Sequence, residues 1–133
     1  MKSIEEIRTF FSGDRFALEA CGISIDEVAE DMAKCSMPIT QMHMNANGFA
    51  QGGAIYTLCD ITFAVAANAG NALVVSQSAN ISYLRPGTGA RLYAKAQRIN
   101  EGKTSCLYQV NVMDENGKLV AFASIQGFRK VNE

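Results

Sequence analysis

Residues that bind metals are scarce in this sequence. The chain of 133 residues has one histidine, His43, and no two of its four cysteines form a CxxC pair. A zinc site needs more ligands at closer spacing, so no metal site is expected. The cysteines are interpreted as reduced thiols that serve as small core residues: Cys21, Cys35, Cys59 and Cys106.

Charged residues are also few. Asp, Glu, Lys and Arg make up 19% of the chain, the net charge is −1, and the longest basic run is the pair Arg129-Lys130. Nucleic acids and anionic membranes attract strongly basic surfaces. The charge distribution therefore favours neither nucleic acid nor a membrane as a partner.

No segment has the pattern of a cleaved leader or of a membrane span. Two glutamates interrupt the N-terminal stretch MKSIEEIRTFF, where a signal peptide needs an apolar core. The run from Gly52 to Val75 is long enough to cross a membrane, but it contains Asp60 and has no positively charged flank. We therefore expect a cytoplasmic location.

One carboxylate is isolated within this neutral sequence. Between Lys34 and Arg85, Asp60 is the only charged residue, and its segment, QGGAIYTLCDITFAVAANAG, is apolar or small nearly throughout. A surface helix has a polar face, and this segment has none, which predicts a buried central helix over residues 52–69. A carboxylate in such a helix is costly unless it is paired, hydrogen-bonded or used in catalysis.

The rest of the chain predicts short helices followed by strands. Ser3 and Glu6 form a capping-box pattern, and short helices are expected within residues 3–21. Alternation of polar and apolar residues, with hairpin turns, predicts antiparallel strands. Two strands are expected in residues 23–39 with a turn near 26–30, and four more, joined in hairpins, at 73–84, 91–100, 103–113 and 118–128.

A helix that is apolar on every side needs cover on every side. One curved antiparallel sheet can wrap most of it, and a second subunit can cover the rest. This predicts an α+β hotdog fold, with residues 1–133 as a single domain. The alternative, a two-layer α+β sandwich, requires a polar outer face that the helix lacks.

The central segment has the groups needed to hydrolyse an activated ester. A carboxylate in an apolar setting is a stronger base, so Asp60 can activate water or attack a carbonyl itself. The backbone N–H groups of Gly52 and Gly53 would lie at the positive end of the helix and can form an oxyanion hole. A thioester is the natural substrate for this pair of groups.

The spacing of these groups requires two copies of the chain. Asp60 follows Gly52 by eight residues, which is ~12 Å along a helix at ~1.5 Å per residue. Both groups must come within about 3 Å of the reacting atoms. Two antiparallel helices around a two-fold axis can bring Gly52 of one chain to Asp60 of the other, so a homodimer is expected.

Other roles remain open for these residues. Asp60 can be a structural carboxylate held by an asparagine or by the Thr62 hydroxyl, and the glycine pair can serve helix packing or a turn. Cys59 is a candidate nucleophile only if His43 folds onto it. Three aromatic side chains can belong either to the core or to an acyl pocket: Phe49, Tyr56 and Phe63.

Two motifs resemble those of the PaaI-like acyl-CoA thioesterases, in the 4-hydroxybenzoyl-CoA thioesterase superfamily of hotdog proteins. The first runs from Asn45 through the glycine pair to the Leu-Cys-Asp of residues 58–60. The second is NISYLRPG at residues 80–87. The resemblance covers residues 14–128, and its spacing favours Asn45 over Asn47.

The resemblance implies coenzyme A thioesters as substrates, no separate cofactor, and a homodimer or a dimer of dimers. It implies that Asp60 is the general base or nucleophile and that the Gly52 N–H binds the thioester carbonyl. It further implies that Asn45 places the nucleophile or acyl group and that Ser76 orients water. The substrate-binding residues that it implies are Gln51, Gly53, Arg85 and Pro86.

The sequence departs from the family pattern at Gln51, where the family commonly has histidine. Glutamine forms hydrogen bonds but does not titrate near neutral pH. This departure favours a second hypothesis, a non-catalytic hotdog module that binds acyl-CoA as a sensor. A third, a dehydratase or isomerase acting on an acyl thioester, usually needs a histidine, and His43 lies outside the helix.

Overall fold

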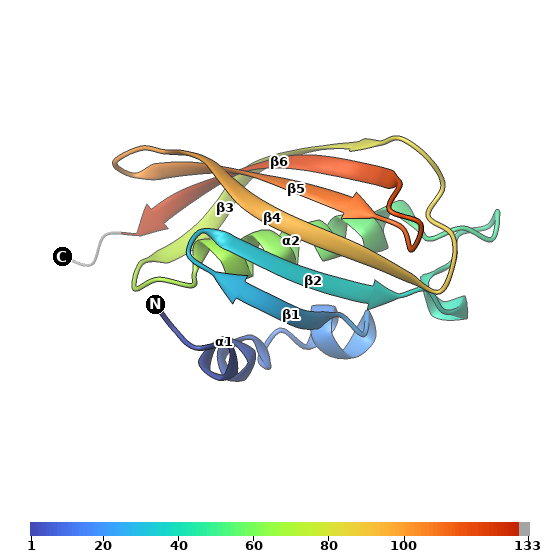
Figure 1. Ribbon diagram of the computed structural model, residues 1–133, viewed down its shortest axis with the longest axis horizontal. Coiled ribbons are helices and arrows are strands. Elements are labelled where there is room, and N and C mark those ends of the chain that lie inside the picture. Colours follow the sequence, from blue (N-terminus) through green and yellow to red (C-terminus); the bar gives the residue numbers. More distant parts are fainter. Residues whose placement is uncertain (131–133) are drawn as a thin grey trace.

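The computed structural model describes residues 1–130, and Figure 1 shows a sheet curved around one long helix. Helix α1 is capped as predicted, because the Ser3 side chain accepts from the Glu6 N–H and the Glu6 side chain accepts from the Ser3 N–H. The helical elements are α1 (Ile4–Phe11), the π-helix η1 (Phe16–Ala20), the 3₁₀ turn η2 (Gln41–His43) and α2 (Gly52–Ala67).

The sheet has six strands in the order β1-β2-β4-β5-β6-β3, and all neighbours pair antiparallel. The strands are β1 (Ser24–Ala29), β2 (Met32–Pro38), β3 (Leu73–Tyr83), β4 (Arg91–Glu101), β5 (Ser105–Met113) and β6 (Leu119–Lys130). The α+β hotdog architecture predicted from the sequence is therefore confirmed.

The core lies between α2 and the concave face of the sheet. Leu58, Phe63 and Val65 of the helix are fully buried, and the Phe63 ring meets the Tyr108 ring edge to face at 5.5 Å. Residues at alternate positions of β5, such as Tyr108 and Val110, face the helix. This packing fixes the rotation of α2 about its axis and therefore determines which of its side chains are exposed.

Two details of the predicted sheet are wrong. The first turn is not at residues 26–30: β1 continues to Ala29, and the chain reverses at Glu30 and Asp31, where Asp31 has φ of 57°. In addition, β3 does not form a hairpin with β4. It pairs with β6 at the sheet edge. The connection of seven residues, 84–90, which includes Pro86, therefore crosses to β4 instead of forming a hairpin.

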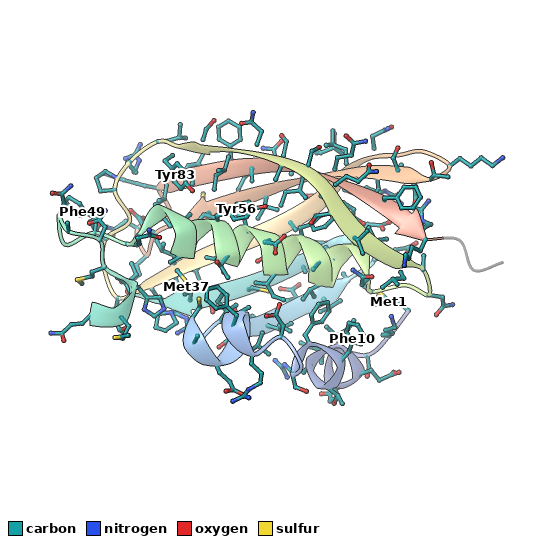
Figure 2. The ribbon with its side chains drawn as sticks, turned by 180° about the vertical axis from the view of Figure 1, so that it is seen from behind. Met1, Phe10, Met37, Phe49, Tyr56 and Tyr83 are labelled. Carbon is teal, nitrogen blue, oxygen red and sulfur yellow. The ribbon has the colours of Figure 1, made fainter. Side chains whose placement is uncertain are left out.

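One side of α2 is not covered within the chain. Figure 2 shows this side, with β3 passing on one flank of the helix and the N-terminal helices on the other. The residues along it are small or polar and are exposed or half-buried: Gly53, Tyr56, Thr57, Asp60, Ala64 and Ala67. Within residues 1–130, no helix is long and apolar enough to cross a membrane.

Candidate active site

The N-terminus of α2 presents two backbone donors that have no partner. Gln51 is the N-cap, so Gly52 and Gly53 are the first two helical residues. Their N–H groups are among those that a helix leaves without an internal acceptor. Within the described part of the chain nothing accepts from either N–H. These donors lie at the positive end of the helix and can bind a developing oxyanion.

The Gln51 side chain has a structural role at this position. Its Oε1 accepts a hydrogen bond from the Ala54 N–H at 3.2 Å, and its backbone N–H donates to the His43 carbonyl at 2.7 Å. A Cβ on Gly53 would lie 2.7 Å from the Gln51 Oε1, so glycine leaves room for this cap. Gln51 and Gly53, predicted to bind substrate, thus shape the helix start together.

Removing the cap is expected to destabilise the protein. Gln51→Ala removes the side-chain acceptor of the Ala54 N–H, which keeps its 2.9 Å bond to the backbone carbonyl of residue 51. A cost near the lower end of the ~0.5–2 kcal/mol range for loss of an N-cap is therefore expected. Urea unfolding followed by circular dichroism measures the change. Gln41→Ala, at an exposed position of η2, is the matched control and should unfold like the wild type. Equal stability of all three proteins would show that the cap contributes nothing.

Tyr83 fixes the peptide beside the oxyanion donors. Its hydroxyl donates to the Gly52 carbonyl at 2.9 Å, and its ring lies 3.3 Å from where a Cβ on Gly52 would be. The Gly52 carbonyl and the Gly53 N–H belong to one peptide group, so this bond orients the Gly53 N–H as well. The sequence motif includes Tyr83, but no role was predicted for it.

Four predicted site residues line one cavity at this end of the helix. The cavity has a volume of about 350 Å³ and lies near the labelled Phe49 and Tyr83 in Figure 2. Asn45 lies in its wall, and its Oδ1 accepts from the N–H groups of Asn47 and Phe49, so it also holds the loop. The predicted residues brought together here are Asn45, Gly52, Arg85 and Pro86.

Asp60 lies two turns further along the open side of α2. It is half-buried, and burial raises the pKa of its carboxyl above 3.8, with a smaller contribution from the negative charge of Asp14. Within residues 1–130 no group donates a hydrogen bond to this carboxylate. Thr62, a candidate structural partner, instead donates to the Leu58 carbonyl at 2.6 Å. The Asp60 carboxylate is thus available as a base.

A single chain does not assemble all the predicted catalytic residues. Gly52 and Asp60 occupy one continuous helix, so they remain ~12 Å apart along its axis. Ser76 lies on the exposed edge strand β3, opposite Gly127 and next to a bulge at Gln77. Neither Asp60 nor Ser76 lines the cavity beside Gly52.

Cys59 and His43 do not form a catalytic pair. Cys59 is fully buried, and burial raises the pKa of its thiol to about 12, so the thiol is protonated near neutral pH. The buried His43 ring has other partners: Nε2 lies 2.6 Å from the Cys21 carbonyl, and Nδ1 accepts from the Thr40 N–H. His43 therefore braces the loop that leads into α2, a role that its sequence position did not reveal.

A curved antiparallel sheet around one long helix defines a hotdog protein. Within residues 1–130, the free N–H groups at the helix start and the Asp60 carboxylate are groups that thioester hydrolysis can use. A family model described as the thioesterase superfamily matches residues 47–121. The chain belongs to this superfamily, which confirms the resemblance and the enzyme class predicted from the sequence.

Individual relatives agree with this assignment. The chain is 31% identical over 121 residues to the acyl-coenzyme A thioesterase PaaI of Escherichia coli, covering 90% of this chain and 86% of the relative. It is 30% identical over 131 residues to a putative esterase of Archaeoglobus fulgidus, covering 98% and 84%. The solved structure of E. coli PaaI superposes with a TM-score of 0.84 at 26% identity, over 98% of both chains.

Proposed function

We propose that the protein hydrolyses acyl-CoA thioesters to a free carboxylic acid and coenzyme A. The observation that carries this proposal is the pair of N–H groups at Gly52 and Gly53, which have no acceptor within residues 1–130, together with an Asp60 carboxylate that accepts no hydrogen bond from the same residues. Water adds to the thioester carbonyl, the C–S bond breaks, and the thiolate leaves and takes up a proton. The two relatives compared above are named as a putative esterase and as an acyl-coenzyme A thioesterase, which supports this reaction class.

The proposed site lies between two subunits, where the partner subunit's Asp60 meets Gly52. The open side of α2 provides the surface for this contact, because its small residues allow a second helix to approach closely. The carboxylate activates water or attacks the carbonyl, and the Gly52 N–H stabilises the oxyanion. Ser76 would orient the water. At least a homodimer is required, and the family resemblance extends this to a dimer of dimers.

The cavity beside Gly52 is proposed to receive the coenzyme A part of the substrate. Arg85, in its wall, carries a positive charge, which suits the phosphates of the coenzyme. The Arg85 Nε already donates to the Leu119 carbonyl at 3.0 Å, which holds the side chain in place. Asn45 offers amide groups to the thioester or the pantetheine chain.

The proposal is tested by a panel of acyl-CoAs that includes acetyl, butyryl, octanoyl and decanoyl groups. Phenylacetyl-CoA is added because E. coli PaaI comes from the phenylacetic acid degradation operon. Free thiol released on hydrolysis is measured with a thiol reagent. Catalytic release of coenzyme A from at least one member is expected. Saturable binding without release from any member would instead favour the acyl-CoA sensor.

A further inference from the structure

Tyr56 lies midway between the two groups of the proposed site. On α2, Gly52, Tyr56 and Asp60 follow one another at intervals of four residues, so they lie along one side of the helix. Tyr56 is ~6 Å along the axis from each of the other two, at ~1.5 Å per residue. Its side chain is half-buried on the open side of α2, where Figure 2 labels it. Tyr56 is therefore outside the fully buried core, one of the two places that the sequence left open for it.

The proposed dimer places Tyr56 beside the two-fold axis. When Gly52 of each chain meets the partner's Asp60, the axis passes the two helices midway between positions 52 and 60. Tyr56 occupies this midpoint. It therefore lies in the subunit interface, opposite the open helix side of the partner. This placement rests on the proposed thioesterase site and follows from the symmetry of that site.

The direction of the Tyr56 ring decides which carboxylate its hydroxyl can reach. Long side chains on a helix lean toward the helix N-terminus and cover the preceding turn. Burial raises the pKa of Tyr83, and Cys59 and Tyr56 add to this shift, so the Tyr56 phenol lies near Tyr83. The Tyr83 hydroxyl donates to the Gly52 carbonyl. Both observations direct the Tyr56 phenol toward Gly52, where the partner's Asp60 would lie.

The Tyr56 hydroxyl is a donor without an acceptor in the described part of the chain. Among residues 1–130, the hydroxyls of Tyr83 and Tyr108 form hydrogen bonds, whereas that of Tyr56 forms none. Burial raises the pKa of the Tyr56 phenol above 10.0, and the charge of Asp60 adds to the shift. The hydroxyl therefore keeps its proton near neutral pH. A partly buried tyrosine hydroxyl usually finds an acceptor, and the Asp60 carboxylate is an acceptor without a donor among the same residues.

We propose that the Tyr56 hydroxyl donates a hydrogen bond to the partner's Asp60 across the subunit interface. The bond holds this carboxylate beside the Gly52 N–H, where the thioester carbonyl binds, so Tyr56 is a positioning residue. A donor also stabilises the ionised form of a carboxylate and so opposes the effect of burial. The hydroxyl therefore keeps more of the Asp60 carboxyl in the ionised form that acts as a base.

Tyr56→Phe tests the bond, because it removes the hydroxyl and keeps the ring. Without the donor, the pKa of Asp60 should rise, and the acid midpoint of kcat/KM against pH should move up by about one unit. The plateau of kcat should fall by about tenfold, with KM within about twofold of wild type, because the carboxylate is held less well. The charge of Asp14 also acts on Asp60 and is the same in every variant.

The matched control is Tyr93→Phe. It removes the hydroxyl of an exposed tyrosine on β4 and should leave the pH profile and kcat unchanged. Both variants are measured with the best substrate of the acyl-CoA panel. An acid midpoint of Tyr56→Phe equal to that of the wild type would overturn the assignment.

Mixed dimers determine which subunit supplies the hydroxyl. In a dimer of an Asp60→Asn chain with a Gly52→Pro chain, the one complete site combines Gly52 of the first chain with Asp60 of the second. Tyr56→Phe added to the Asp60→Asn chain removes the proposed donor from this site, so the acid midpoint should rise by about one unit. Added to the Gly52→Pro chain, the same substitution alters only the defective site, and the midpoint should stay where it was.

The outcomes separate this inference from the proposed function. A rise of the midpoint that follows the Gly52→Pro chain would assign the hydroxyl to Asp60 of its own subunit and overturn the bond between subunits. Active mixed dimers with no rise in either arrangement would overturn it too, while the thioesterase function stands. Mixed dimers without activity would contradict the shared site on which the bond depends. No turnover of any acyl-CoA by the wild type would contradict the proposed function itself.

Discussion

Replacing Asp60 with asparagine is expected to lower kcat for acyl-CoA hydrolysis by about 10²–10⁴-fold. Asparagine keeps the size of the side chain but cannot take a proton from water or form an acyl intermediate. Steady-state assays with the best substrate of the panel measure the effect. Asp26→Asn is the matched control, because Asp26 is an exposed carboxylate on β1, and it should keep wild-type activity.

The same substitution is expected to leave stability unchanged or higher at neutral pH. Burial raises the pKa of Asp60, so the folded protein holds this proton more tightly than the unfolded chain. Stability contributed by the group therefore falls as pH rises from about 3.8 through the folded pKa, and the ionised form is disfavoured above it. The neutral asparagine side chain carries no such penalty. A lower melting temperature of Asp60→Asn at pH 7 would show that the carboxylate is structural.

The activity of the wild type is expected to fall at low pH. Asp60 must be ionised to act as a base, so kcat/KM is expected to fall as pH drops through its raised pKa. The midpoint should lie above 3.8, the ordinary value for aspartate. A pH–rate profile measured over the range in which the protein stays folded provides the check.

Gly52→Pro is expected to lower kcat by about 10²–10³-fold, because it deletes the proposed oxyanion donor. Proline is well tolerated as the first residue of a helix, where the N–H has no partner inside the helix. Gln51 before it has φ of −67° and ψ of 137°, an extended conformation that a following proline favours. The substitution therefore removes the N–H at small cost to the helix.

Gly52→Ala is the control for this substitution. Alanine adds a Cβ at 3.3 Å from the Tyr83 ring, as proline does, but it keeps the N–H. Tyr83 is 49% exposed and can move aside. A much larger loss of kcat in the proline variant than in the alanine variant would assign the effect to the N–H. Equal losses in both would assign it to crowding against Tyr83 instead.

The fold could be predicted largely because its signals are local. The absence of a polar face identified α2 and its start at Gly52, and alternation located all six strands to within a few residues. The place of β3 could not be predicted in this way. Its partner is β6 rather than β4, and such pairing depends on residues far apart in the sequence, which hairpin spacing alone does not specify.

The site was only partly visible in the sequence for the same reason. Asp60 and Gly52 could be singled out, because an isolated carboxylate and a glycine pair at a helix start are unusual locally. The bond from Tyr83 to Gly52 joins residues 31 positions apart, and the His43 bond reaches Cys21 over 22 positions. The Gln51 cap is different, because a residue directly before a helix can be recognised locally as an N-cap. The family pattern, which commonly has histidine at this position, instead implied a substrate-binding role.

Mixing two inactive variants tests the shared site most directly. Asp60→Asn supplies an intact Gly52 and Gly52→Pro supplies an intact Asp60, so a mixed dimer contains one complete site and one doubly defective site. After subunit exchange of equal amounts, half of the dimers are mixed, and activity should recover to about one quarter of the wild-type level. Activity no greater than the sum of the two variants, with exchange verified by mass spectrometry, would contradict a site built from Gly52 of one subunit and Asp60 of the other.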